Sequence, residues 1–539
     1  MRLIKILAPT LLLISIASTS AFAVDAKGLP DGFTTLHIGD SAPNFNLPGI
    51  DGKQYSLSDF AGPDILVVYF TGTHCPTSHG AMGRVLEFVE DFQDESFAFV
   101  AINPNHSSGL RPDEFGHTDY DETFADSKRY AEDYGWTFPF LFDGDAQVID
   151  GRGHFVMPGM VESHAHLSYT DNGPLELDKS PVEEVMIKTI RNARVMLGSG
   201  FTSAISFGSV HRVDAFLKRG IECGDVLGPR LLAGGRDIGS TGSNADLHPD
   251  YAQLKIDGLG MITDGPWEVR KAVRTLSKNG VDVVKVMIDG ELISSGGGIK
   301  PGVLGFTDEE LEVLVAEAHH RGMRVACHAR SAAAVKQAVK AGVNFIGHAN
   351  YLDDDALTLL EANRDRVFVG PAVAWEITFL EHYQSFGFET GSPEHEGYAA
   401  ELEATQTSVK RMREAGIRVL VGGDYGLNIT PHGTYAKELQ YFTDYFGFSP
   451  GEALQAATKH GGEAFMPDSS LGTLEAGKIA DMVIVKGNPL EQISVLQDAD
   501  NITAVIKDGK IYAGLLDSRS PHHKRPEELN HVLGASPCN

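Results

Sequence analysis

Apolar runs of strand length alternate with helical periodicity along most of the chain. Between residues 35 and 148, the runs 65–70, 97–103 and 138–142 predict three strands, and residues 80–92 have the spacing of an amphipathic helix. Strands that alternate with helices need crossover connections. This segment therefore predicts a small α/β domain with a parallel or mixed sheet.

From residue 155 onward the alternation becomes longer and more regular. Eight apolar runs predict strands, at 155–163, 202–207, 230–235, 282–288, 324–329, 345–349, 366–372 and 417–423. Helical periodicity separates most of them, as at 309–320 and 331–341. Eight βα units over 155–465 predict an α/β fold of the (β/α)8 TIM barrel type. Strand-like runs at 482–485 and 502–512 predict a small C-terminal β layer over 466–515, and residues 516–539 predict a polar tail.

The first 23 residues have the pattern of a secretory signal peptide. Arg2 and Lys5 precede an apolar stretch at 6–17, and Ala21-Phe22-Ala23 is a small-x-small cleavage site. A membrane anchor is the alternative, but the stretch is short for a span and contains Pro9. Later segments lack a run of about 18 apolar residues. We therefore expect an exported protein, periplasmic or secreted, without stable membrane insertion.

Charge and composition exclude some classes of binding partner and of protein. The chain of 539 residues carries 73 acidic and 45 basic side chains, a formal net charge of −28, which argues against nucleic acid as a partner. A hydrophobic fraction of 42% is typical of a globular protein that buries a large core. Four cysteines, at 75, 223, 327 and 538, are too few for a disulfide scaffold.

Cys75 lies where the first N-terminal strand would meet a helix. There the thiol would face unpaired N–H groups and the positive end of the helix dipole, which favour the thiolate. The turn His74-Cys75-Pro76 and the entry segment 39–45 make residues 35–148 resemble the redoxin branch of the thioredoxin fold. Ser78 stands at the second position of a Cys-x-x-Cys motif, and residues 35–148 contain no second cysteine, which excludes a dithiol cycle within the domain. Cys75 is then either a structural remnant or a single-thiol redox site.

Polar residues recur at the predicted C-terminal ends of the barrel strands, the rim where barrel enzymes place their chemistry. Side chains two apart on an extended chain point to the same face, so the two histidines of the first strand converge. Each residue alone has an ordinary explanation, as a hydrogen-bonded core histidine, a snorkelling lysine or a helix cap. Their joint arrangement indicates a metal site. The six residues are His164, His166, Lys285, His328, His348 and Asp424.

With these residues in place, the chain resembles the amidohydrolase superfamily, specifically the imidazolonepropionase-like branch that includes dipeptidases and phenylurea-type hydrolases. The matching segments are 156–167, 284–287, 328–330, 347–348, 422–426 and 471–481. The resemblance covers about 155–515. It implies that His164, His166 and Asp424 hold one divalent metal ion and that His328 and His348 hold a second, with zinc the best-suited metal. Lys285, carboxylated by CO₂, would bridge the two ions.

The resemblance also implies a reaction. Two cations that share one water lower its pKa, deliver hydroxide and polarise the substrate carbonyl, and Asp424 would pass the proton to the leaving amine. The expected function is hydrolysis of a carbon–nitrogen bond in a small amide such as a dipeptide or an N-acyl amino acid. Carbamates, ureas and lactones would undergo the same attack. A single-thiol redox protein that uses Cys75, or a binding protein without turnover, are the alternatives from other classes.

Secondary candidates surround this set. Arg330 could hold a substrate carboxylate in bidentate fashion or pair with a neighbouring acid. Tyr425 and His432, in the loop after the eighth strand, could contact substrate. Asn244 stands where related sequences often carry the histidine of a Gly-Gly-His run, which argues against an electrophilic role there. The acidic stretch 394–403 predicts the solvated face of an insertion or lid.

One departure from the family pattern concerns the residues before the barrel. Relatives usually begin with β structure that pairs with the C-terminal strands, whereas here the redoxin-like segment comes directly before the barrel. Residues 143–154 could supply a hairpin, because Asp150-Gly151-Arg152-Gly153 is good turn chemistry. Otherwise the C-terminal strands would have an open edge that invites pairing with another subunit. We expect a homo-oligomer.

Overall fold

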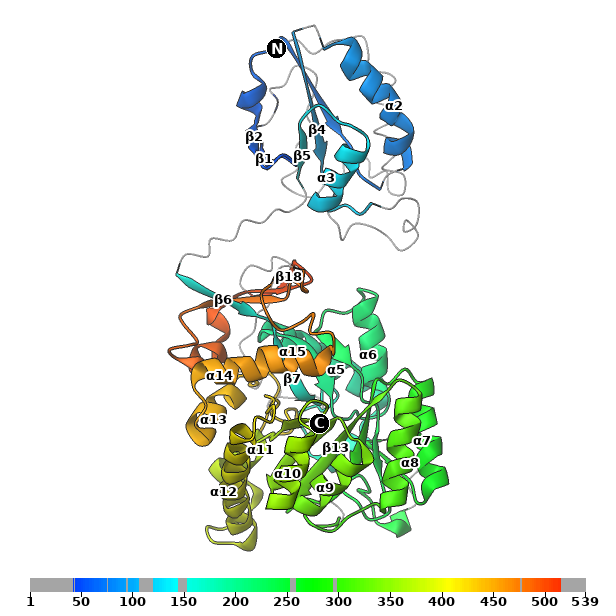
Figure 1. Cartoon of the computed structure of the whole chain (residues 1–539), viewed down its shortest axis with the longest axis vertical. Helices are drawn as coiled ribbons and strands as arrows, with labels where there is room; N and C mark the ends of the chain where they lie inside the picture. Colours follow the sequence, from blue (N-terminus) through cyan, green and yellow to red (C-terminus); the bar gives the residue numbers. More distant parts are fainter. Residues whose placement is uncertain are drawn as a thin grey trace. The chain divides into compact units, whose positions relative to one another are not determined.

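The computed structural model describes residues 42, 44–74, 76–93, 96–105, 120–143, 153–252, 258–293, 298–475 and 477–514. The chain forms two compact units, which divide after Asp150 and are drawn in Figure 1 in blue to cyan and in cyan to red. The predicted signal peptide, Cys75 and the polar tail lie outside the described residues. Among the described residues, no helix combines the length and the apolar character that crossing a membrane requires.

The N-terminal unit is built on a three-stranded parallel sheet of order β3-β4-β5. Its strands fall on the three predicted runs, and a short hairpin precedes them. Aromatic side chains fill its core, as where the rings of Phe99 and Phe138 lie 4.7 Å apart. The elements are β1 (Asn46–Pro48), β2 (Gln54–Ser56), β3 (Ile65–Phe70), α2 (Pro76–Asp91), β4 (Phe97–Asn103), α3 (Phe124–Asp133) and β5 (Phe140–Phe142).

The C-terminal unit contains parallel strands on seven of the eight predicted runs. Its parallel strands are β7 (Met160–Ala165), β8 (Phe201–Ser206), β9 (Arg230–Leu232), β10 (Asp237–Gly239), β11 (Gly260–Ile262), β12 (Val283–Met287), β13 (Arg324–Ser331), β14 (Phe345–Tyr351) and β15 (Phe368–Gly370). The eighth run, 417–423, forms only an isolated bridge between Val419 and Val369, and two short strands, β10 and β11, were not predicted. Backbone N–H groups connect neighbours across the sheet boundaries: that of Val283 donates to Ala233 O at 3.0 Å, and that of Leu420 to Val369 O at 2.8 Å. The N–H of Ser163 in turn donates to Val421 O at 3.2 Å, which returns the order to β7. The arrangement is TIM-barrel-like.

Helices follow these strands and cover them (Figure 1). α8 shows why a helix forms at its place: Thr307 and Glu310 make a capping box at its start, and Leu311, Leu314, Val315 and Ala318 bury one stripe. α9 ends at Gly342, whose φ of 99° suits a residue without a Cβ. The helices are α4 (Pro174–Lys179), α5 (Val182–Gly198), α6 (Val213–Glu222), α7 (Pro266–Lys278), α8 (Asp308–His320), α9 (Ala332–Ala341), α10 (Asp354–Ala362), α11 (Ala374–His382), α12 (Pro393–Glu414), α13 (Lys437–Phe446), α14 (Pro450–Gln455) and α15 (Gly461–Phe465).

The strand expected over 155–163 is two strands with separate partners. β6 (His154–Pro158) pairs antiparallel with β16 (Met482–Lys486), and only the following β7 joins the barrel. The break falls at Gly159, where an added Cβ would collide with Thr202 on the neighbouring strand. β17 (Ile502–Lys507) and β18 (Lys510–Ala513) complete a four-stranded sheet of order β18-β17-β16-β6.

This sheet bears on the expectation that the C-terminal strands would have an open edge unless a segment before the barrel paired with them. The edge of β16 is covered by β6, a segment from immediately before the barrel, so the layer and the barrel share one continuous stretch of chain. Residues 144–152, where a hairpin was expected, lie outside the described part of the chain. The C-terminal layer therefore includes residues that the sequence had assigned to the first barrel strand.

An ion pair fastens this layer to the barrel and gives a first test. Arg230 of β9 donates hydrogen bonds to the buried Asp481 at 2.5 and 3.0 Å. Asp508, which is 57% exposed, forms a second ion pair with Arg230. Because Asp481→Asn leaves a half-buried guanidinium without its main partner, we expect the free energy of unfolding to fall by about 3 kcal/mol. Urea denaturation measures it, with Asp508→Asn as the matched control, for which the loss should be much smaller. Equal losses in both variants would contradict this role for Asp481.

Candidate metal centre

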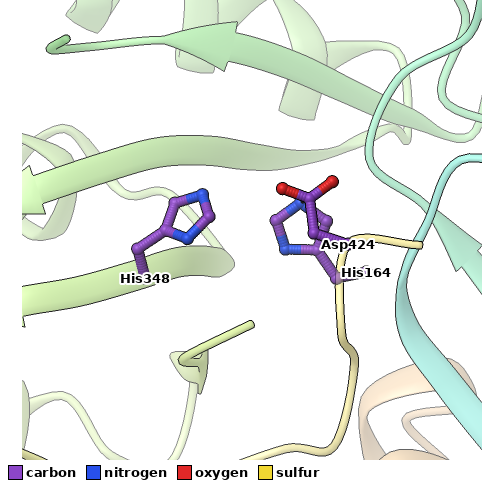
Figure 2. A group of neighbouring side chains, drawn as sticks. All are labelled: His164, His348 and Asp424. Carbon is purple, nitrogen blue, oxygen red and sulfur yellow. The ribbon is translucent and has the colours of Figure 1, made fainter. Parts of the chain in front are cut away.

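The structure brings the predicted ligands together at the C-terminal end of the barrel strands. Asp424 Oδ1 lies 3.0 Å from His166 Nε2 and 3.8 Å from His164 Nε2. The rings of His328, on β13, and His348, on β14, are 4.5 Å apart. Figure 2 shows His348 facing His164 and Asp424 across a short gap. Ligand atoms of these last three residues lie within 4.8 Å of one another, a spacing that suits one shared cation.

Strained backbone aims two of these side chains inward. His348 has a φ of 82° and Asp424 a φ of 57°, in the left-handed region that residues with a side chain rarely adopt. Such a conformation costs on the order of 1–3 kcal/mol and clusters at functional sites. Gly422 is needed just before Asp424, since a Cβ there would come within 2.6 Å of the His164 backbone nitrogen. The chain thus accepts local strain to place both ligands.

The protonation states suit metal binding. Burial holds the pKa values of His164, His328 and His348 well below the ordinary range, so these imidazoles are neutral and keep a lone pair. Burial acts to raise the pKa of Asp424, but the neighbouring His164 and His166 hold it well below its usual value. The buried Nδ1 atoms of His164 and His348 have no hydrogen-bond partner among the described residues. Neutral nitrogen donors with open lone pairs beside a carboxylate fit a divalent cation.

Lys285 lies in the same wall, on β12. Its side chain is buried, with Nζ 4.5 Å above the ring of Phe207, which in turn stacks on His164. Burial lowers the pKa of Lys285, because an ammonium ion is poorly solvated there. A lowered pKa increases the fraction of free amine, the form that reacts with CO₂.

A cavity of about 320 Å³ opens over this centre. An aromatic wall faces the ligands, built from Trp375 and Phe379 of α11, Phe386 and Phe388 after it, and Tyr398 of α12. Polar side chains on the remaining walls include Asp237, Asn244, Glu291 and Arg330. The volume fits a small substrate, and the wall supplies apolar contact around a charged centre.

Arg330 pairs with neighbouring acids, which is the second of the two roles expected for it. It is buried and surrounded by acids: its Nη1 donates to Glu401 at 2.9 Å and to Glu376 at 3.2 Å, and its Nη2 donates to Glu291 at 3.0 Å. Its Nε also lies 2.8 Å from Glu291 in an ion pair, without hydrogen-bond alignment. Glu401 belongs to the acidic stretch 394–403, so the expectation that this stretch is a solvated face is wrong at that residue. The guanidinium holds α11 and α12 against the barrel.

The other secondary candidates lie behind the cavity, and neither Tyr425 nor His432 lines it. The ring of Tyr425 packs on Tyr435 at 5.2 Å. Both ring nitrogens of His432 are engaged, with Tyr435 Oη at 2.7 Å and Tyr169 O at 2.8 Å. Since Tyr169 stacks on His166 at 4.2 Å, His432 positions a ligand through it. Asn244 does reach the cavity.

Sequence reasoning missed two cavity acids. Ligand atoms of Glu291, His328 and His348 lie within 4.8 Å of one another, a second candidate cation cluster. Asp237 is buried, and burial raises its pKa to about 6. Asp237 follows the third predicted strand, 230–235, and Glu291 follows the fourth, 282–288. The rule that selected Lys285, a charged residue at a barrel strand end, could have found them.

In the N-terminal unit, the described residues around position 75 form a polar cluster. The buried Glu122 carboxylate contacts His74 Nδ1 and accepts hydrogen bonds from Asn103 Nδ2 at 2.6 Å and Thr73 Oγ1 at 3.1 Å. His74, which directly precedes Cys75 in the sequence, is thereby held in place. Cys75 itself lies outside the described residues, so its redox role stays a prediction.

Comparison with known proteins decides the family. Residues 155–512 match the amidohydrolase family model. The chain belongs to the amidohydrolase family. Residues 38–173 match the AhpC/TSA family, in keeping with the redoxin resemblance of the N-terminal unit. This family member is a metal-dependent hydrolase that acts on carbon–nitrogen bonds.

Several relatives are similar over most of this region. An ochratoxinase from Aspergillus niger is 27% identical over 377 residues, 67% of this chain and 76% of that protein. A solved prolidase, complexed with N-methylphosphonate-L-proline, is 28% identical with a TM-score of 0.62, over 69% of this chain and 91% of that one. A Xaa-Pro dipeptidase with bound methionine is 30% identical with a TM-score of 0.58, over 69% and 92% of the two chains.

The acid cluster around Arg330 gives a pH-dependent prediction. Burial raises the pKa of Glu376 to about 8 and that of Glu291 to about 7. Between the ordinary glutamate pKa and these raised values, the folded state binds more protons than the unfolded state. The free energy of unfolding contributed by these buried glutamates therefore falls as the pH rises through that range. Arg330→Met removes the charge that favours the ionised carboxyls. We expect a loss of about 4 kcal/mol in the free energy of unfolding near pH 8.5, and a clearly smaller loss near pH 5.5.

Urea denaturation at the two pH values measures the effect. Arg274→Met is the matched control, because Arg274 pairs with Glu317 at 2.9 Å but is 54% exposed. It should change stability little at either pH. A loss in Arg330→Met that is the same at both pH values, or larger in acid, would contradict the account of the cluster.

Proposed function

We propose that this chain is a binuclear metal-dependent amidohydrolase that hydrolyses the carbon–nitrogen bond of a small amide such as a dipeptide or an N-acyl amino acid. The observation that carries the proposal is the convergence of buried imidazoles on Asp424 beneath a small cavity. Similarity to a prolidase, a Xaa-Pro dipeptidase and an ochratoxinase supports a small amide or peptide substrate.

In this proposal the six converging residues share two divalent ions, for which zinc is the best-suited metal. His164, His166 and Asp424 would hold one ion, and His328 and His348 would hold the other. Lys285, carboxylated by CO₂, would supply an anionic ligand to both ions in place of a poorly solvated ammonium. The lowered pKa of Lys285 supports this step, because only the free amine adds CO₂.

Each residue then has a chemical role. When bound, the metal ions supply an activated water and polarise the substrate carbonyl. Asp424 would accept a proton during the attack and donate it to the leaving nitrogen, since its lowered pKa keeps the carboxylate ionised at rest. The aromatic wall, with Trp375, Phe379 and Tyr398, excludes bulk water and packs against the substrate.

Carbamates, ureas and lactones remain alternative substrates of the same site, because the attack on their carbonyl carbon is the same. We propose further that the chain is exported by its first 23 residues, on the pattern of Arg2, Lys5 and Ala21-Phe22-Ala23. Assembly into a homo-oligomer is part of the same proposal.

Metal content tests the assignment of Lys285. We expect the mature chain, expressed with zinc and bicarbonate, to hold about two equivalents of zinc and Lys285→Ala to hold less than half of that, because the bridging anion is lost. Elemental analysis measures both. Added acetate or propionate should restore part of the metal, since a free carboxylate can fill the space left by the side chain. Unchanged zinc content in Lys285→Ala would rule out the bridge.

Asp424 can be separated from its role as a ligand by a conservative variant. Asp424→Asn keeps an oxygen donor but cannot accept the proton, so we expect kcat to fall by about 1,000-fold with zinc content reduced far less. Steady-state kinetics on a dipeptide series, with elemental analysis of the same samples, measures both. A proportional loss of zinc and activity would mean that Asp424 serves only as a ligand.

A further inference from the structure

The walls of the cavity bear more negative than positive groups. Asp237, Glu291 and Asp424 line it, against Lys285 and Arg330. Arg330 is not available to a ligand in this arrangement: its side chain is 2% exposed, and Glu291, which is 22% exposed, lies against it. If Lys285 is carboxylated, it too is an anion. Away from the metal ligands, the cavity therefore offers acceptors of hydrogen bonds and no free cation among the described residues.

Asp237 stands out among the buried acids of this region. It begins β10, its side chain is 3% exposed, and its Oδ1 has no hydrogen-bond partner among the described residues. The nearby buried Asp214 is the opposite case: its Oδ2 accepts hydrogen bonds from Ser206 Oγ at 3.0 Å, Gly234 N at 2.7 Å and Gly235 N at 2.9 Å. A buried carboxylate oxygen without a partner costs several kcal/mol, so Asp237 is built to meet a group that the protein itself does not supply.

Asn244 is the second unpartnered group on this wall. It lies 91% buried in the loop that follows β10, and neither Oδ1 nor Nδ2 of its side chain has a hydrogen-bond partner among the described residues. Both Asp237 and Asn244 line the cavity over the metal centre. Two side chains from one short segment thus present a carboxylate and an amide to the same space, with their hydrogen-bonding capacity unused.

A carboxylate accepts hydrogen bonds only, and an amide oxygen accepts as well, so the pair is complementary to a group with several N–H donors and a positive charge. We propose that Asp237 and Asn244 form a subsite for the protonated amine of the substrate, which makes the enzyme selective for dipeptides with a free α-amino group over N-acyl amino acids. The substrate class named here rests on the proposed amidohydrolase function. The subsite itself is a claim about binding and can be tested without turnover.

The kinetic test uses the zinc-loaded full chain and two matched substrates, methionyl-proline and N-acetyl-methionyl-proline. We expect the wild type to favour the free dipeptide by about 100-fold in kcat/KM, since a buried group left unpaired by the wrong substrate discriminates strongly. In Asp237→Asn this ratio should fall to a few-fold, and in Asn244→Ala to an intermediate value. Asp246→Asn is the matched control: its carboxylate lies in the same loop, accepts a hydrogen bond from Gly242 N at 2.9 Å and does not line the cavity. The control should keep the wild-type ratio.

The binding test uses L-methioninol and its des-amino analogue, neither of which has an amide bond to hydrolyse. Calorimetry on the zinc-loaded wild type should show tighter binding of the amine by at least about 10-fold, and Asp237→Asn should abolish this preference. If no amide is hydrolysed but this pattern holds, the proposed function fails and the subsite stands. If dipeptides are hydrolysed with no preference for the free amine, or the two probes bind equally or not at all, the subsite is overturned.

Elemental analysis of Asp237→Asn separates the subsite from a supporting role at the metal centre. Asp237 lies near enough to Lys285 to raise the pKa of the lysine. The competing explanation for the buried carboxylate is therefore that it orients Lys285 and does not contact the substrate. We expect Asp237→Asn to keep its zinc while it loses the preference for the amine. Loss of zinc together with a uniform loss of activity on both substrates would overturn the proposal.

Discussion

The structure of the candidate metal centre depends on the burial of several ionisable side chains away from water. Four imidazoles, a carboxylate and a lysine are packed at the mouth of the barrel, where burial lowers the pKa values of His164, His328, His348 and the lysine and so favours their neutral forms. Such a collection is costly on its own, because each buried polar atom needs a partner. Positive φ values at His348 and Asp424 add local strain. Divalent cations would answer both costs at once, since neutral nitrogens and an ionised carboxylate are the donors that they bind.

The surrounding shell keeps this arrangement fixed. His432 holds the backbone of Tyr169, and the ring of Tyr169 stacks on His166. On the other side, Arg330 gathers Glu291, Glu376 and Glu401 and so ties α11 and α12 to the strands that carry His328 and His348. The guanidinium also determines what the cavity presents to a ligand, because Glu291 rather than Arg330 faces the open space. The same ion cluster thus contributes to stability and to the charge of the substrate site.

Local rules predicted most of the barrel strands and the convergence of the polar side chains at their ends, because these features depend on short stretches of sequence. His164 and His166 share a face since they are two residues apart on a strand, and the remaining ligands end apolar runs that barrel strands require. Non-local contacts were out of reach. Nothing near residues 154–158 indicates that they pair with 482–486, and Arg330 could not be assigned between a ligand and an acid because its partners are 39, 46 and 71 residues away in the chain. Glu401 was misread for the same reason, since its acidic neighbours made an exposed face the natural interpretation.

The central claim is that the buried ligands exist to hold two metal ions. Anomalous diffraction at the zinc absorption edge, from crystals of the mature chain grown with zinc and bicarbonate, tests it most directly. The account predicts two adjacent peaks, one bound by His164, His166 and Asp424 and one by His328 and His348, with continuous density from Lys285 between them. A single peak, or a centre without zinc in which the imidazoles bond to one another and to ordered water, would contradict it.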